Sequence, residues 1–151
     1  MRNREIHTEI EIDAPPAHVW AVLTDFSRYG QWNPFIREIR GAARPGEVLS
    51  VTVQPPGTDP MVFRTRVTQA APAGELAWVG RLPVPGLLSG EHSFMVAPAG
   101  DGRRSRFIQH ENFSGLLLPL FGADVEDATR RGFEAMNAAL KAEAERDAGR
   151  H

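Results

Sequence analysis

Cysteine is absent from this chain of 151 residues, and its absence excludes several kinds of chemistry at once. Without it the chain has no disulfides, no thiol nucleophile and no cysteine ligands for a metal. The formal net charge is only −2, so no overall basic field favours nucleic acid or an anionic membrane. No apolar run approaches the roughly 18 residues of a membrane-spanning helix. We therefore expect no nucleic-acid partner and no membrane insertion.

Targeting, metal and nucleophile motifs are also missing from the sequence. Residues 1–5 lead directly into a strand pattern, without the apolar region of a secretion signal, so we expect a cytoplasmic protein. The five histidines show no spacing typical of a metal site, and no serine lies in a nucleophile elbow. The sequence predicts neither a metal nor another cofactor.

The N-terminal quarter of the chain predicts a strand followed by two helices. Residues 6–12 alternate apolar and polar side chains, the period of a half-buried strand. Two prolines and a carboxylate in residues 13–16 favour the start of a helix, and apolar residues at helical spacing continue to residue 26. A second, short helix over residues 27–32 cannot extend far, because Pro34 follows it.

The rest of the chain predicts an antiparallel sheet and one long helix. Six strand patterns separated by short turns cover residues 35–40, 48–53, 61–70, 75–81, 90–96 and 105–114. From about Leu116 to Leu140 the apolar period becomes helical. We expect a single α+β domain over residues 1–151, with a curved sheet of about seven strands in the order β-α-α-β6-α. Since one helix cannot fill the concave face of so wide a sheet, the fold predicts an apolar cavity between them.

Several short stretches along nearly the whole chain resemble one large superfamily. They are residues 12–15, 19–26, 32–35, 90–94, 111–115 and 130–137, together with Tyr29. In them the chain is similar to the START, polyketide cyclase and Bet v 1 superfamily, whose fold is called helix-grip. The likeness is greatest to the bacterial group named SRPBCC or polyketide cyclase/dehydrase proteins. The resemblance implies the fold that the residue patterns also predict.

Function does not follow from this fold alone, because the superfamily includes lipid carriers, hormone receptors, cyclases, quinone-binding proteins and co-chaperone domains. We favour a carrier or sensor that binds a small hydrophobic or aromatic molecule in the cavity, since the sequence offers only one acid/base pair. The second hypothesis is a metal-free cyclase or dehydratase acting on a polyketide-like carbonyl compound. The third is a protein-interaction module with a vestigial cavity.

His92 and Glu111 form the candidate catalytic pair. If the last hairpin pairs Val96 with Phe107, His92 lies directly opposite Glu111 on the same face of the sheet. A histidine beside a carboxylate in an apolar cavity is an oriented acid/base, with His92 as base and Glu111 as its orienter or acid. Two polar groups that satisfy each other in the core remain the structural alternative, and a register slip of one residue would separate them.

Large apolar residues on the faces predicted to point inward form the candidate ligand-binding wall, with one glutamine among them. They are Trp32, Phe35, Phe63, Trp78, Phe94, Gln109, Phe113, Phe121, Phe133 and Met136. Each alone is typical of an ordinary core, whereas together they are typical of a ligand pocket with few polar groups. Gly132 interrupts the long helix, which predicts either the close approach of a ligand or strand, or tolerated drift.

Two apolar, proline-containing segments lie outside the regular elements. Residues 82–89 and residues 116–120 are rich in leucine. Their composition suggests either a flexible gate over the cavity or a homodimer contact.

Overall fold

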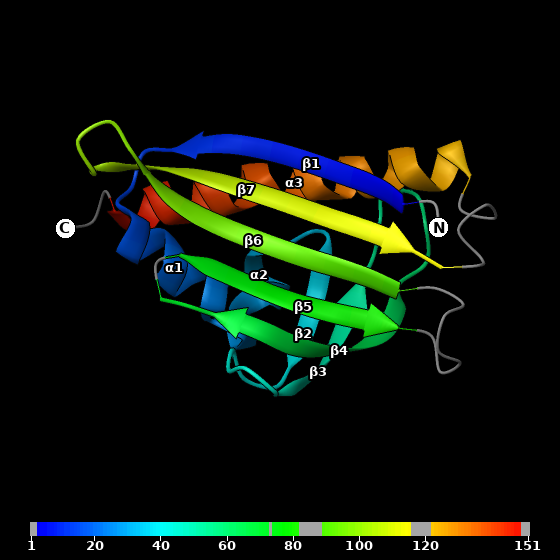
Figure 1. Ribbon diagram of the computed structural model, residues 1–151. Helices are drawn as coiled ribbons and strands as arrows, with labels where there is room; N and C mark the ends of the chain where they lie inside the picture. Colours follow the sequence, from blue (N-terminus) through cyan, green and yellow to red (C-terminus); the bar gives the residue numbers. More distant parts are fainter. Residues whose placement is uncertain (1–2, 73, 82–88, 116–121, 149–151) are drawn as a thin grey trace.

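The computed structural model describes residues 3–72, 74–81, 89–115 and 122–148 (Figure 1). The elements in chain order are β1 (Asn3–Ile12), α1 (Pro16–Thr24), the 3-10 helix η1 (Phe26–Arg28), α2 (Tyr29–Trp32), β2 (Ile36–Arg40), β3 (Val48–Val53), β4 (Met61–Ala70), β5 (Glu75–Arg81), β6 (Ser89–Ala99), β7 (Arg104–Ser114) and α3 (Ala123–Ala148). The predicted order of strand, two helices, six strands and one long helix is confirmed. Phe121, the predicted gate segment 82–88 and residues 116–120 lie outside the described residues.

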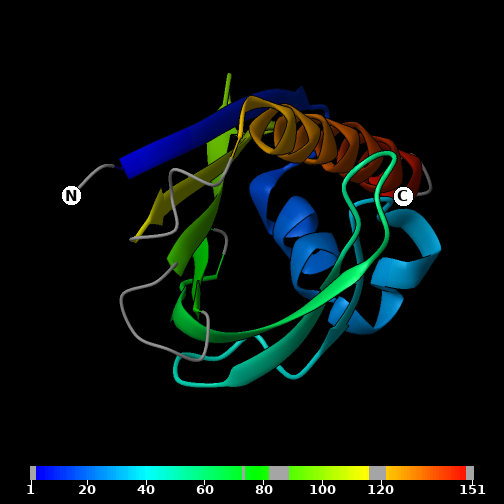
Figure 2. The same cartoon turned by 90° about the vertical axis from the view of Figure 1, so that its right-hand side faces the viewer.

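All seven strands form one antiparallel sheet in the order β1-β7-β6-β5-β4-β3-β2. Consecutive strands from β2 to β7 are neighbours, as short turns require. β1 then pairs with β7, so the first and the last strand of the chain are neighbours, with β1 at the edge of the sheet. Figure 2 shows the sheet curling around α1 and α2, with α3 lying across its open side. This is the helix-grip arrangement that the sequence predicts.

The first two helices are held by local polar contacts as well as by apolar packing. α1 starts with a proline and buries Val19 and Leu23 against the sheet. The hydroxyl of the buried Tyr29 donates to the carbonyl of Leu23, which ties α2 back to α1. Asn33 then ends α2, since its side-chain oxygen accepts the backbone N–H groups of Phe35 and Ile36 at 2.9 Å.

From Phe133 onward, α3 closes one end of the space inside the sheet. Phe133, Met136 and Leu140 are fully buried at helical spacing and pack into the main core. Gly132 allows the helix to approach the Phe35 ring, because a Cβ there would lie 2.3 Å from a ring carbon. The neighbour that approaches Gly132 is thus the Phe35 side chain.

Strand β6 extends beyond its predicted end at Val96 and includes Pro98. The pairing of β6 with β5 ends at Met95, so this part of β6 has no β5 partner on one side. A proline is tolerated at such a position, since it removes no ladder hydrogen bond from a central strand. Of the helices within residues 3–72, 74–81, 89–115 and 122–148, none combines the length and the apolar character needed to cross a bilayer.

Candidate functional site

A cavity of about 620 Å³ lies between the sheet and the N-terminal part of α3. Its floor comes from β2 to β7, and its other side comes from the first turns of α3 and from residues 55–59. The described residues that line it are Phe35, Ile36, Val51, Val53, Pro55, Thr58, Asp59, Met61, Phe63, Thr65, Trp78, Gly80, Ser89, Gly90, His92, Glu111, Phe113, Asp124, Val125, Ala128 and Thr129. Most are apolar, so the sequence-based expectation of an apolar hollow at this place is met.

The register of the last hairpin agrees with the prediction. Val96 pairs with Phe107, and His92 therefore lies directly opposite Glu111. Both side chains point to the concave face and line the cavity. His92 Nδ1 lies 3.5 Å from Glu111 Oε1, and the exposed fractions of the two side chains are 6% and 15%. Glu111 is therefore the more accessible member of the pair.

Two phenyl rings enclose the imidazole of His92. The Phe94 ring stacks on it with centroids 4.1 Å apart, and the Phe133 ring stacks on it at 4.8 Å. This burial lowers the pKa of His92 to about 3, with a further lowering from His110, while the hydrogen bond to Gln109 opposes the change. His92 is consequently neutral at physiological pH.

Gln109 selects which nitrogen of His92 carries the proton. The Gln109 amide nitrogen donates to the Phe133 carbonyl at 3.2 Å and to Asn137 Oδ1 at 2.8 Å. Because a backbone carbonyl can only accept, the amide oxygen of Gln109 faces His92 Nε2, at 2.9 Å. That oxygen also only accepts, so the proton resides on Nε2 and the lone pair of Nδ1 points toward Glu111.

The carboxyl group of Glu111 holds a proton at neutral pH. Burial raises its pKa to about 8, well above the ordinary value of 4.5. A neutral carboxylic acid beside an unprotonated imidazole nitrogen is a consistent pair, in which Glu111 has the proton and His92 Nδ1 has the free lone pair. The sequence predicts His92 as the base and Glu111 as its orienter or acid, whereas the lowered pKa of His92 favours the acid alternative for Glu111 and disfavours His92 as a base.

The predicted wall residues occupy three different places. Phe35, Phe63, Trp78 and Phe113 line the cavity, as do His92 and Glu111. Phe94, Gln109, Phe133 and Met136 are fully buried in the packed core beside it and are absent from its lining.

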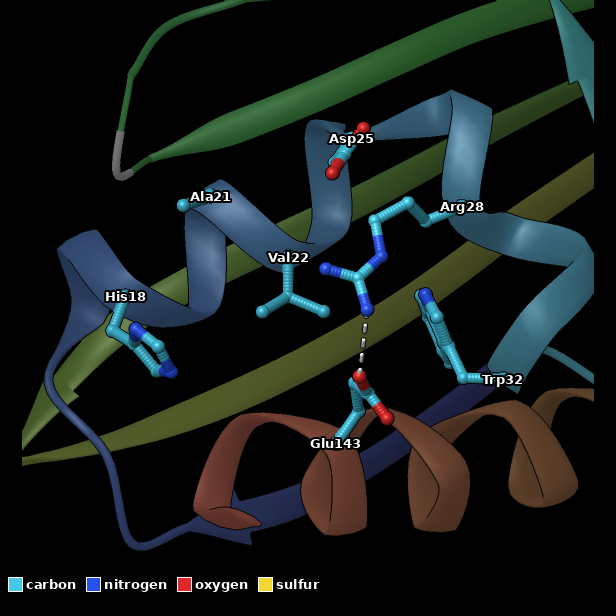
Figure 3. A pocket seen from close by; sticks show the side chains of 7 residues that line it. All are labelled: His18, Ala21, Val22, Asp25, Arg28, Trp32 and Glu143. Atoms are coloured by element: carbon cyan, nitrogen blue, oxygen red, sulfur yellow. Dashed lines mark ion pairs between the residues drawn. The ribbon is translucent and has the colours of Figure 1, made fainter. Parts of the chain in front are cut away.

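Trp32 differs from the expectation, because it lines a second pocket of about 160 Å³ with His18, Ala21, Val22, Asp25, Arg28 and Glu143. Its ring lies edge-on to the buried Tyr29, with centroids 5.0 Å apart, which turns it away from the main cavity. Figure 3 shows Arg28 reaching from η1 toward Glu143 on α3, at 3.8 Å. Arg28 and Glu143 there form an ion pair, and the pocket is too small for a molecule of several rings.

The sequence reasoning missed the smaller residues of the main cavity. It selected large aromatic side chains, whereas Val51, Thr65, Gly80 and Gly90 also line the hollow. Strand alternation was the available signal, since Thr65 has the same parity as Phe63 on β4. A cavity stays open where the lining residues are small, and a selection of large side chains overlooks those residues.

Comparison with known proteins agrees with this architecture. The chain matches the family described as polyketide cyclase / dehydrase and lipid transport over residues 3–145. A search of curated proteins found no match.

Solved structures show the same fold at low sequence identity. An aromatase/cyclase named Zhui from a Streptomyces species has a TM-score of 0.75 and 19% identity, with 97% of this chain and 96% of that chain covered. A START superfamily protein from Mycobacterium smegmatis has a TM-score of 0.75 and 22% identity, with 94% and 97% covered. Norcoclaurine synthase from Thalictrum flavum, in complex with a transition-state analogue, has a TM-score of 0.69 and 14% identity, with 97% of each chain covered. The chain belongs to the polyketide cyclase / dehydrase and lipid transport family.

Proposed function

We propose that this protein binds a small or medium-sized hydrophobic molecule in the cavity between the sheet and α3, as a carrier or sensor. The observation that carries the proposal is the cavity itself, with its volume of about 620 Å³ and its mostly apolar lining. Ligand pockets are typically of this size, apolar, and furnished with a few convergent polar groups. Burial of an apolar ligand contributes about 25 cal/mol per Å² removed from water, before the costs of binding.

The titration of a fluorescent naphthalene probe tests this proposal, with one variant that fills the cavity and one matched control. Ala128 lines the cavity from α3, whereas Ala138 on the same helix is exposed to solvent. The A128F variant places a ring in the hollow, so we expect it to lower the affinity at least tenfold, while A138F leaves it unchanged. Equal affinity in both variants would place the probe elsewhere and contradict the proposal.

Native mass spectrometry of the freshly purified protein identifies what it retains. A bound lipid, quinone or other aromatic compound that is lost in A128F supports the carrier function. The open cavity also weighs against the interaction module, which expects a vestigial one.

A second candidate function is proton transfer to a carbonyl ligand, and the His92–Glu111 pair favours it. In this scheme the Glu111 carboxylic acid hydrogen-bonds the carbonyl oxygen of a bound ketone and stabilises the enolate that forms there. The α-proton leaves to a water molecule, and the one carboxyl proton of Glu111 points to the ketone oxygen instead of to His92 Nδ1. Glu111 is the acid in this scheme, because its raised pKa keeps the proton available at neutral pH.

Deuterium exchange at the α-carbon of tetralone, an aromatic bicyclic ketone, tests this candidate without knowledge of the natural substrate. We expect the protein to accelerate exchange over buffer, and the acceleration to decline above a pH of about 8, where Glu111 ionises. The E111Q variant removes the acid and should abolish the acceleration while it still binds the ketone. Exchange that is equal in E111Q and wild type would dismiss a catalytic role for this pair.

A further inference from the structure

Gly90 is a glycine whose backbone conformation does not require glycine. It lies on the central strand β6, where it pairs with Gly80 on β5 and with Phe113 on β7. Its φ angle lies outside the positive range that favours glycine. Glycine weakens the interior of a strand, because it has no side chain to pack and loses more conformational freedom on folding. The space beside Gly90, and not its backbone, is therefore the better reason for glycine at this position.

The carboxyl group of Glu111 occupies the place where a side chain at residue 90 would begin. A Cβ on Gly90 would lie 2.7 Å from Glu111 Oε2 and 3.4 Å from two carbons of the Phe113 ring. The first distance is shorter than two such atoms tolerate, whereas the second is close to an ordinary van der Waals contact. Alanine at this position would therefore displace the carboxyl group and leave the ring in place.

The other oxygen of the same carboxyl group faces His92. His92 follows Gly90 by two residues, so both residues lie on the cavity face of β6. Glu111 Oε1 lies 3.5 Å from His92 Nδ1. With Oε1 toward His92 and Oε2 over Gly90, the carboxyl group lies against the strand. The burial that results from this position raises the pKa of Glu111 to about 8.

We propose that Gly90 is a positioning residue for Glu111, because the absence of a side chain at residue 90 lets the carboxyl group lie against β6 beside His92. Any larger residue would move the carboxyl group toward the open cavity. The inference rests on the second candidate function, in which Glu111 is the acid that meets the ketone. It adds the residue on which the position of that acid depends.

The titration of the Glu111 carboxyl carbon by nuclear magnetic resonance tests this inference in the G90A variant. G90A should fold, because the atom that has to move is at the end of a flexible side chain. A displaced carboxyl group is more exposed to water, so its midpoint should fall from about 8 toward 4.5 by at least about one pH unit. The alkaline decline of tetralone exchange should move to lower pH with it.

The matched control is G80A, which makes the same substitution on the neighbouring strand. A Cβ on Gly80 would lie 3.2 Å from the methyl carbon of Thr65 and meets no carboxyl group within 4 Å. Both variants add a methyl group to a strand glycine that lines the cavity. We expect the Glu111 midpoint to stay at its wild-type value in G80A. A merely structural glycine at residue 90 would lower the stability of G90A without moving this midpoint.

A second measurement uses the wild-type protein and depends on no variant that has to fold. One α-proton of Gly90 takes the direction of the missing Cβ and so points to the Glu111 carboxyl group. Its chemical shift should change with the same midpoint as the Glu111 carboxyl carbon. The E111Q variant should abolish this change.

The outcomes separate this inference from the second candidate function. An unchanged or raised Glu111 midpoint in G90A, or Gly90 α-protons that do not respond to the ionisation of Glu111 in the wild type, overturns the inference. Failure of the wild type to accelerate tetralone exchange dismisses the second candidate function instead. In that case the two titrations still decide whether Gly90 positions the carboxyl group.

Discussion

The two halves of α3 face very different surroundings, although the same sheet lies opposite both. Around Phe133, Met136 and Leu140 the space is filled by fully buried side chains. Around Val125 and Ala128 the space is open and forms the cavity. The difference follows from side-chain volume on both walls, since the closed half has large residues and the open half has small residues on the helix and glycines on the sheet. The hollow is thus a property of the sequence and does not follow from the fold alone.

Polar groups are also treated differently in the two halves. In the closed half, Gln109 and Asn137 are buried and bonded, and Asn137 donates to the Thr8 hydroxyl at 2.9 Å. Beside the open half, the Thr65 hydroxyl is buried and has no hydrogen-bond partner among the described residues. The satisfied network of the closed half favours one rigid arrangement and supports the fold.

The largest expected contrast is between two phenylalanines, one from each half. Phe133 is fully buried, and F133A should lower the free energy of unfolding by about 3 to 5 kcal/mol, because it leaves a cavity in a closed core. Phe63 is 41% exposed at the open cavity, and F63A should cost about 1 kcal/mol. Urea denaturation of both variants measures the contrast, and equal losses would show that the two halves are packed alike.

Two glutamine-to-leucine substitutions compare a buried hydrogen-bond network with an exposed hydrogen bond. Q109L removes the acceptor of the His92 N–H and the donor to Asn137 Oδ1 in a closed core, which should cost about 3 kcal/mol. The Gln54 side chain donates one exposed hydrogen bond, to the Thr58 carbonyl at 3.2 Å, so Q54L should cost about 0.5 kcal/mol or less. Similar midpoints for the two variants in chemical denaturation would contradict the importance of the buried network.

Glu111 and His92 give the free energy of unfolding a predictable pH dependence. The folded-state pKa of Glu111 is raised from 4.5 to about 8, so its contribution is present below pH 4.5 and is lost as the pH rises to 8. The pKa of His92 is lowered from 6.5 to about 3, so its contribution is present above pH 6.5 and is lost as the pH falls to 3. The two slopes cancel between pH 4.5 and 6.5, where we expect a plateau.

The E111Q variant isolates the alkaline part of this profile. From pH 6.5 to 8 the wild type should lose about 2 kcal/mol, and E111Q should lose none of this amount. The matched control is E91Q, because Glu91 is exposed on the neighbouring strand and should leave the loss unchanged. Denaturation series at several pH values measure the profile, and an alkaline loss that persists in E111Q would refute the assignment.

The smallest contrast concerns two glycines near α3. Alanine favours a helix over glycine by about 1 kcal/mol, yet a Cβ on Gly132 would overlap the buried Phe35 ring, so G132A should be destabilising by about 1 to 2 kcal/mol. A Cβ on Gly122 meets nothing within 4 Å, so G122A should change the stability by no more than about 0.5 kcal/mol. Thermal unfolding compares them, and a stabilised G132A would mean that the ring moves aside freely.

The fold was predictable because periodicity is a local property of the sequence. Alternation in residues 61–70 and helical spacing toward Leu140 each identify an element without knowledge of its neighbours. The His92–Glu111 pairing was also predictable, since a short hairpin determines its own register. These features depend on residues that are close along the chain.

The lining of the cavity was harder to predict, because it depends on how the helices pack against the sheet. Trp32 has the bulk and the position of a wall residue, but packing against Tyr29 turns it to another side of the helices. Strand alternation placed Thr65 on the same face as Phe63, but its missing hydrogen-bond partner among the described residues depends on three-dimensional packing. The protonation of the His92 pair likewise depends on the Phe94 and Phe133 rings, which approach from different elements.

The position of a bound naphthalene probe, measured by nuclear Overhauser effects to assigned protein methyl groups, tests the central claim most directly. We predict contacts from the probe to the methyl groups of Thr65, Val51 and Ala128, which line the open half. The methyl groups of Met136 and Leu140 should show none, because they belong to the closed half. Contacts to these two residues, or a probe without contacts to the open half, would contradict the account.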